Sequence, residues 1–204
     1  MIATRYKMVF GRMLEPLARG MVRAGIPPSV LTVSGAVLSG LVCLWFIRTR
    51  AVLPFCVAIV VTGGLDALDG AVARSGGRVT KFGAYLDAVC DRYVEAAGAI
   101  AAAVVTGYWV LSAAVLAGAL LVSYAKARAA MEVNVSNQEW PDLMERTERD
   151  LLFVAGLAAS AIWPVTILGR DLFWWTLAIL AVLIHLTVLQ RVWRARRLIW
   201  ERSR

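Results

Sequence analysis

Long apolar runs separated by short polar segments form the main pattern along the chain. Each run approaches the roughly 20 residues that a helix needs to cross the hydrocarbon core of a bilayer. The pattern predicts an all-α integral membrane protein with six transmembrane helices, at residues 30–47, 51–73, 82–105, 108–128, 148–168 and 172–192. Because no low-complexity linker appears and the polar segments leave no room for a separate soluble domain, residues 1–204 are expected to form a single transmembrane domain.

The N-terminal residues 2–23 have a different pattern, in which apolar and basic positions occupy separate faces of one helix. The apolar positions recur every four residues, at Val9, Met13, Leu17 and Met21. The basic positions gather on another face, at Arg5, Arg12, Arg19 and Arg23. This pattern predicts an amphipathic helix that lies in the membrane interface, with its arginines among the lipid headgroups.

The composition agrees with a membrane protein, because 60% of the 204 residues are hydrophobic and soluble domains have roughly 45–50%. The net charge is +8, and the basic residues flank the apolar runs. Membrane lipids and phosphorylated substrates are therefore the expected partners, and nucleic acid is not. The positive-inside rule places both termini and the polar segments 74–81 and 126–150 on the cytoplasmic side of a cell membrane.

Acidic residues inside the apolar sequence are the candidate chemistry, at Asp66, Asp69, Asp87 and Asp91. The first two are three residues apart and the last two are four apart, so each pair lies on one helix face. A polar turn over 74–81, with two glycines, reverses the chain and brings the pairs to a similar depth. Unpaired carboxylates are costly at that depth, and divalent cations compensate them most simply. Oxygen-only ligands favour magnesium or manganese over zinc.

The stretch 66–91 resembles the signature of the CDP-alcohol phosphotransferase family at every fixed position, D-x-x-D-G-x-x-A-R, eight residues, then G-x-x-x-D-x-x-x-D. The resemblance implies that the four aspartates hold two Mg²⁺ or Mn²⁺ ions over the pyrophosphate of a CDP-lipid. It implies that Asp91 also removes the proton from the acceptor hydroxyl, which attacks the lipid-side phosphorus directly. It further implies contacts with the CDP-lipid from Thr32, Asp69, Gly70, Ala73, Arg74 and Gly83.

Two shorter stretches, SYAKAR at 123–128 and ERTER at 145–149, look like those of the phosphatidylinositol-phosphate synthase and archaetidylinositol-phosphate synthase branch. That branch implies transfer of a phosphatidyl-type group from CDP-diacylglycerol or CDP-archaeol to inositol 1-phosphate, with release of CMP. A phosphorylated acceptor needs a cationic pocket, and arginine forks suit phosphate oxygens. The candidates for this pocket are Lys126, Arg128, Arg146, Arg149, Arg191 and Arg194.

The residues leave several alternatives open. The same chemistry can act on glycerol 3-phosphate, serine or free inositol. A divalent-cation channel or transporter would use the acids as a permeation site. A structural network would pair the aspartates with Arg74 and Arg92, and the loop arginines would then be ordinary positive-inside charge. The enzyme is favoured because a pore needs acids but not glycines and an arginine at these intervals.

Small residues four positions apart provide the only sign of assembly. They are Ala36 with Gly40 and Ala113 with Ala117. Such pairs permit close helix contacts, either within one chain or between two chains. We expect a homodimer on this basis.

Overall fold

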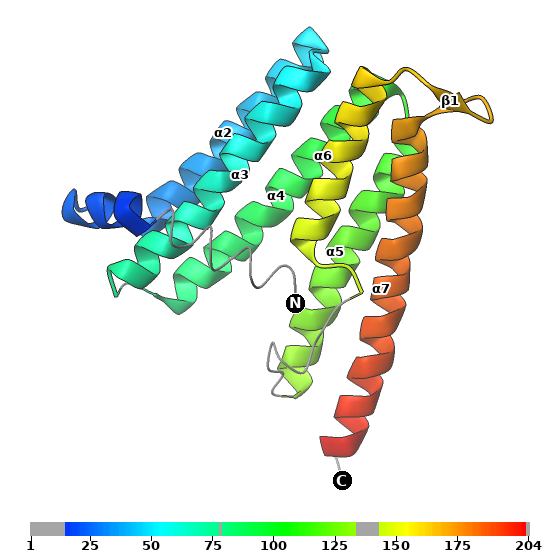
Figure 1. Ribbon diagram of the computed structural model, residues 1–204. Helices are drawn as coiled ribbons and strands as arrows, with labels where there is room; N and C mark the ends of the chain where they lie inside the picture. Colours follow the sequence, from blue (N-terminus) through cyan, green and yellow to red (C-terminus); the bar gives the residue numbers. More distant parts are fainter. Residues whose placement is uncertain (1–14, 78, 134–142, 203–204) are drawn as a thin grey trace. The chain divides into compact units, whose positions relative to one another are not determined.

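Helices account for nearly all of the chain that the structure describes (Figure 1). The computed structural model describes residues 15–77, 79–133 and 143–202, except for the side chain of Asp66. Within these ranges a helix over residues 15–23 precedes the following elements: α2 (Pro28–Thr49), α3 (Val52–Ser75), α4 (Lys81–Thr106), α5 (Trp109–Glu132), α6 (Arg146–Ile162), β1 (Thr166–Ile167), β2 (Arg170–Asp171) and α7 (Leu172–Arg202). The chain divides into two compact units, residues 1–101 and 102–204, with the boundary inside α4.

Four of the described helices are long and apolar enough to cross a membrane, namely α2, α3, α5 and α7. The best 18-residue windows of these helices have mean hydropathies between 1.7 and 2.2. Charged side chains between residues 87 and 95 make α4 more polar, and α6 is only 17 residues long. The architecture is that of a helical membrane protein, and the helix that carries two of the aspartates is less apolar than its neighbours.

In the first unit, α2 and α3 form a helical hairpin. Phe46 near the end of α2 stacks on Phe55 near the start of α3, with ring centroids 4.0 Å apart, and both rings are fully buried. Arg50 adopts a left-handed backbone with φ of 54° and ends α2. Because a stacked, buried aromatic pair stabilises one relative placement of two helices, it holds the hairpin closed at this end.

The helix over residues 15–23 packs on the opposite end of this hairpin. Ala18 is fully buried beside Leu68 and Val72 of α3, and Met21 packs against the same cluster. Leu17 is 53% exposed, so the apolar face predicted from the sequence is divided between α3 and the surroundings. The other two positions of that face, Val9 and Met13, lie outside the described residues.

The predicted turn between the two aspartate-bearing helices is confirmed. α3 ends at Ser75, and Gly77 follows with φ of +63°. This left-handed conformation costs a residue with a side chain far more than it costs glycine. The N–H of Gly83 donates to the Thr80 hydroxyl, with 2.9 Å between the nitrogen and the oxygen, and α4 begins at Lys81.

In the second unit, α7 packs against both α5 and α6, and a glycine permits each close approach. A Cβ at Gly118 of α5 would lie 2.6 Å from Cγ2 of Ile184. A Cβ at Gly156 of α6 would lie 2.6 Å from Cβ of Thr176. Small residues let helix backbones approach closely in this way. The small residues predicted from the sequence to permit close contacts are different ones, and a Cβ at one of them, Gly40, would meet no described atom within 4 Å.

We therefore expect Gly156→Val to destabilise the protein strongly. The added side chain overlaps Thr176, and overpacking of this kind costs about 3 kcal/mol or more when the helices must separate. The expected result is a melting temperature lower by on the order of 10 °C in detergent. Gly98→Val in α4 is the matched control, because a Cβ there meets no described atom within 4 Å. An unchanged melting temperature for Gly156→Val would contradict the close α6–α7 contact.

The connection between α6 and α7 differs from the sequence prediction. α6 ends at Ile162, whereas a span through residue 168 was predicted. Pro164 cannot donate a helical hydrogen bond, and it disfavours helical backbone in the residue before it. β1 and β2 then pair as a short antiparallel hairpin, so the described chain is not helical throughout. Asp171 begins α7, because its carboxylate accepts from the Trp174 N–H at 2.7 Å.

Candidate active site on the aspartate-bearing helices

The predicted donor-site residues of the first unit lie on three consecutive helices. Thr32 is on α2, and Gly83, Asp87 and Asp91 are on α4. α3 carries the remainder, namely Asp66, Asp69, Gly70, Ala73 and Arg74. The backbone of Asp66 belongs to α3, but its side chain lies outside the described residues.

A side-chain hydrogen bond joins two of these predicted residues. The Thr32 hydroxyl donates to Oδ2 of Asp69, and both side chains are buried, with 7% and 5% of their residues exposed. The threonine therefore orients one carboxylate oxygen of Asp69.

Removal of this hydroxyl is expected to reduce activity. Thr32→Val keeps the shape but leaves Oδ2 of Asp69 without this donor, which costs about 1–3 kcal/mol and lowers the rate of transfer by about tenfold or more. Thr32→Ser keeps the hydroxyl, and we expect it to retain most of the rate of the unaltered protein. Thr62→Val is a matched control, because this buried threonine of α3 donates only to the nearby Ile59 carbonyl at 3.0 Å. Equal rates for Thr32→Val and Thr62→Val would argue against an orienting role.

Gly70 provides the space in which the Arg74 side chain lies. A Cβ at Gly70 would be 3.1 Å from Nη1 of Arg74, one helical turn further along α3. The guanidinium therefore lies back over the glycine. The Gly-x-x-x-Arg spacing thus has a local reason in this chain, in addition to the approach of a nucleotide that the sequence suggests.

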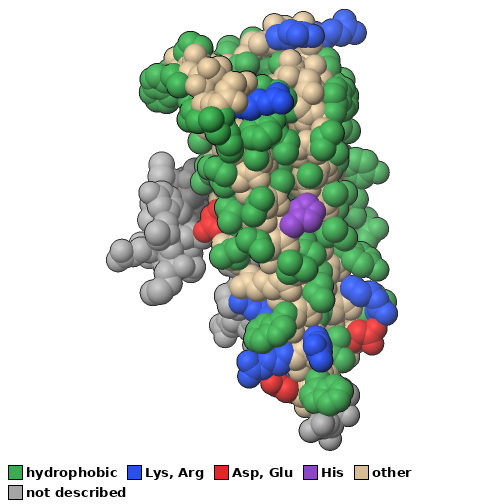
Figure 2. Space-filling model, turned by 90° about the vertical axis from the view of Figure 1, so that its right-hand side faces the viewer, with side chains coloured by type: hydrophobic (Ala, Val, Ile, Leu, Met, Phe, Trp, Pro, Cys, Tyr) green, Lys and Arg blue, Asp and Glu red, His purple; other side chains and the backbone are tan. Residues whose placement is uncertain are grey.

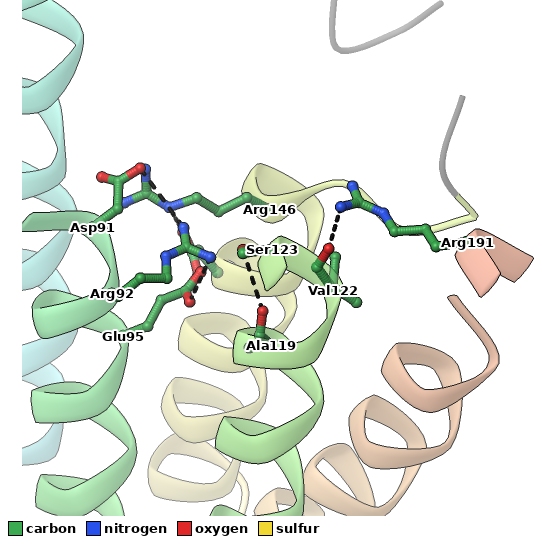
Figure 3. Close-up of polar contacts among 9 residues, drawn as sticks. Asp91, Arg92, Glu95, Ala119, Val122, Ser123, Arg146 and Arg191 are labelled. Atoms are coloured by element: carbon green, nitrogen blue, oxygen red, sulfur yellow. Dashed lines mark hydrogen bonds and ion pairs between the residues drawn. The ribbon is translucent and has the colours of Figure 1, made fainter. Parts of the chain in front are cut away.

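The carboxylate of Asp91 has a cationic neighbour on its own helix (Figure 3). Nη2 of Arg92 lies 3.7 Å from Oδ2 of Asp91, and Nη1 of Arg92 lies 3.1 Å from Oε2 of Glu95. The Glu95 side chain is only 9% exposed. Arg92 therefore bridges two carboxylates and holds positive charge beside the predicted base, as the structural alternative anticipated for this aspartate.

Glu95 and Thr80 were not selected from the sequence. Glu95 lies one turn beyond Asp91, and the i, i+3 spacing from Arg92 is the signal that predicts their pairing. Thr80 directly precedes α4, which is the usual place for a capping hydroxyl. Both residues support the aspartate-bearing helix rather than adding a new chemical group.

The donor atoms of the aspartates fit a hard divalent cation, because all of them are carboxylate oxygens. Among the side chains that the structure describes, no group of three or more histidine, cysteine or acidic residues is close enough to hold a metal ion. The side chain of Asp66, the first aspartate of the signature, lies outside the described residues. The metal ligands therefore stay a prediction from the donor set.

The predicted acceptor residues lie on the three long helices of the second unit. Lys126 and Arg128 are on α5, Arg146 and Arg149 are on α6, and Arg191 and Arg194 are on α7. Arg128 is exposed and pairs with Glu132 at 2.7 Å. This pairing gives Arg128 an ordinary helix-surface role.

The ERTER stretch has a structural function as well as its charges. Glu145 and Glu148 form a capping box at the start of α6, in which Oε2 of Glu148 accepts from the Glu145 N–H at 3.0 Å. The two arginines of the stretch differ, since Arg149 is 6% exposed whereas Arg146 pairs with Asp150 at 3.5 Å. The two glutamates therefore have a structural role in capping α6, apart from any role of the arginines at the acceptor.

The two arginines of α7 have different surroundings. Nη1 of Arg191 donates to the Val122 carbonyl of α5, and the residue is 6% exposed (Figure 3). Nη1 of Arg194 is buried and has no hydrogen-bond partner among the described residues. A buried cationic donor without a partner is costly, so an anion at this position would be stabilising. Arg194 is therefore the strongest acceptor-phosphate candidate of the pair.

Paired aspartates on membrane helices are the mark of a functional site in a membrane-embedded protein. A profile of the CDP-alcohol phosphatidyltransferase family matches residues 26–189, so the chain belongs to this family. The protein is an enzyme of phospholipid biosynthesis that transfers a phosphatidyl-type group, and the channel or transporter interpretation is set aside.

Individual relatives cover most of the chain. The phosphatidylinositol phosphate synthase of Mycobacteroides abscessus is 32% identical over 192 residues, which cover 90% of this chain and 83% of the relative. The archaetidylinositol phosphate synthase of Pyrococcus horikoshii is 31% identical over 188 residues, which cover 90% and 91% of the two chains. A relative named as a phosphatidylinositol phosphate synthase and one named as an archaetidylinositol phosphate synthase are thus about equally similar to this chain.

Solved structures of the Mycobacterium tuberculosis phosphatidylinositol phosphate synthase share the fold. The form with CDP-DAG bound has a TM-score of 0.80 and 27% identity, and the match covers 90% of this chain and 94% of that one. The complex with manganese and citrate has a TM-score of 0.79 and 27% identity, and it covers 89% and 88%.

Proposed function

We propose that the protein transfers a phosphatidyl-type group from CDP-diacylglycerol or CDP-archaeol to inositol 1-phosphate and releases CMP. The proposal of a phosphorylated acceptor rests on Nη1 of Arg194, which is buried and has no hydrogen-bond partner among the residues that the structure describes. The similarity to synthases that are named for inositol phosphate products points in the same direction.

In the proposed mechanism, the Asp91 carboxylate accepts the proton of the acceptor hydroxyl. The acceptor oxygen forms a bond to the lipid-side phosphorus as the bond from that phosphorus to CMP breaks, without a covalent intermediate on the enzyme. Thr32 orients Asp69, and Arg74 adds positive charge at the end of α3 where the donor pyrophosphate is expected. Two Mg²⁺ or Mn²⁺ ions, held by Asp66, Asp69, Asp87 and Asp91, would supply charge neutralisation at the pyrophosphate.

The decisive test supplies the purified protein with Mg²⁺ and a CDP-lipid, and offers labelled inositol 1-phosphate, glycerol 3-phosphate, serine or free inositol in parallel. Both donor types are tried. We expect label to enter lipid only when inositol 1-phosphate is the acceptor, and CMP to be released in equimolar amount. Label from another acceptor would keep the family chemistry and reject the proposed acceptor.

Replacement of Arg194 tests the acceptor pocket directly. Arg194→Gln is expected to raise the KM for inositol 1-phosphate by about 30-fold, because a charge-assisted hydrogen bond to phosphate is worth about 1.5–3 kcal/mol. The KM for the CDP-lipid and the melting temperature should change little, since Nη1 of Arg194 has no described partner to lose.

Arg128→Gln is the matched control, because Arg128 is exposed and paired with Glu132. It should leave both KM values unchanged. Arg191→Gln should lower the melting temperature, because that guanidinium joins α7 to the Val122 carbonyl. An unchanged KM for inositol 1-phosphate in Arg194→Gln would remove Arg194 from the pocket.

We also propose six spans with both termini and the aspartates on the cytoplasmic side, and a homodimer. The distribution of basic segments supports this orientation. Labelling of single cysteines introduced at Val79 and at Leu168 in sealed inverted and right-side-out vesicles tests the orientation, because both positions are exposed and belong to turns that should face opposite sides. Light scattering of the purified protein tests the dimer.

A further inference from the structure

The last helix continues well beyond the length that a membrane crossing requires. α7 has 31 residues, so it extends about 46 Å, whereas the hydrocarbon core is about 30 Å thick. Asp171 begins the helix, and about 20 residues of it suffice to cross. The segment from about Val192 to Arg202 therefore reaches the headgroup layer, although the sequence predicted only a basic tail there.

This extension presents two unlike faces. The residues of α7 that are buried in the second unit form one stripe, at Leu177, Leu180, Ile184, Thr187 and Arg191. Successive residues turn by about 100° around a helix, so the opposite face of the extension carries Trp193, Arg196, Arg197 and Trp200. We call these four residues the Trp–Arg face. Trp193 and Trp200 are 61% and 62% exposed, so this face points away from α5.

The Trp–Arg face lines a shallow, open hollow on the surface of α7. Its volume is about 290 Å³, and Glu201 completes the lining. Glu201 accepts a hydrogen bond from Nε of Arg197 at 2.7 Å, which holds that guanidinium in place. Arg196 lies three residues after Trp193 and four residues before Trp200, so it is on the same side of the helix as both tryptophans. Figure 2 shows basic, acidic and hydrophobic side chains gathered at this end of the molecule, below a mainly hydrophobic surface.

We propose that the Trp–Arg face binds the phosphate of an anionic phospholipid headgroup. Tryptophan prefers the membrane interface, where its ring is apolar and its N–H is hydrated. Arginine forks match phosphate oxygens, and basic residues near the end of a membrane helix attract anionic lipid. The excess of arginine over glutamate on this face selects an anionic headgroup over a zwitterionic one. This site is on the opposite face of α7 from Arg191, and binding there does not depend on the proposed reaction.

The test measures lipid binding to the full-length protein in detergent by native mass spectrometry. Phosphatidylglycerol and phosphatidylcholine with identical chains are the probes. Arg196→Gln is expected to weaken phosphatidylglycerol binding by about fivefold, which is the value of one basic residue at an anionic surface. Phosphatidylcholine binding should be unchanged. Trp193→Ala is expected to weaken the binding of both lipids.

Arg202→Gln is the matched control, since it removes the same charge from the same helix outside the hollow. It should leave phosphatidylglycerol binding unchanged. An equal loss in both arginine variants, or no loss in Arg196→Gln, would overturn the proposal. Displacement of the lipid by millimolar inorganic phosphate would show that the site takes free phosphate, and it would also overturn the assignment to a headgroup.

Discussion

Asp91→Asn is expected to lower the rate of transfer by about a thousandfold or more, the upper range for loss of a general base. Asparagine keeps the shape of aspartate but cannot accept the acceptor proton, and it binds a divalent cation weakly. The Arg92–Glu95 ion pair at 3.1 Å remains in the variant, so α4 should keep its local structure. The rate is measured as label transferred to lipid under single-turnover conditions.

The control for Asp91→Asn is a carboxylate outside the site. Glu132→Gln removes a half-exposed charge that only pairs with Arg128, and its rate should equal that of the unaltered protein. The melting temperature of Asp91→Asn is measured alongside, so that a loss of fold is distinguished from a loss of chemistry. A folded Asp91→Asn protein with a rate within tenfold of the unaltered one would rule out Asp91 as the base.

Removal of divalent cations is expected to abolish transfer. Asp69, Asp87 and Asp91 belong to α3 and α4, and negative charge on membrane helices is costly unless it is compensated, which divalent cations do most simply. Treatment with EDTA should reduce the rate to that of Asp91→Asn. Added Mg²⁺ or Mn²⁺ should restore it, whereas Ca²⁺, which prefers more ligands at longer distances, should restore it poorly.

A second measurement separates metal binding from catalysis. Binding of Mn²⁺ to the metal-free protein is followed by electron paramagnetic resonance, and we expect Asp69→Asn and Asp87→Asn each to weaken it by at least tenfold. Bound Mn²⁺ should also raise the melting temperature, because a ligand that binds only the folded state stabilises it. Full activity in EDTA would refute metal dependence in this protein.

The helices were predictable from the sequence because a long apolar run in a membrane must satisfy its backbone hydrogen bonds internally, which an α-helix does. α4 was expected at 82–105 and spans Lys81–Thr106. The errors are at α6 and α7, where periodicity alone does not mark an end. Pro164 stops α6 early, and α7 continues through a basic segment because arginine is a good helix former.

The candidate site was predictable in part, for a related reason. Fixed spacings along one helix place Asp87 and Asp91 on one face, and they also pair Arg92 with Glu95. Contacts between helices do not follow from such spacings. The hydrogen bond from Thr32 to Asp69 joins residues 37 apart, and the bond from Arg191 to the Val122 carbonyl joins residues 69 apart.

The membrane helices, the aspartate signature and the family follow from the amino-acid sequence alone, because they depend on local composition and on intervals within single helices. Which polar groups find partners depends on how the helices pack. This packing separated Arg191, whose guanidinium holds α7 to α5, from Arg194, whose buried Nη1 has no described partner. It also placed Gly118 and Gly156 where helices approach closely, whereas a Cβ at Gly40 would meet no described atom within 4 Å. Hydrogen bonds and steric contacts between helices depend on the rotation of each helix about its axis and on the angle at which two helices cross. These angles cannot be derived from residue spacings within a single helix.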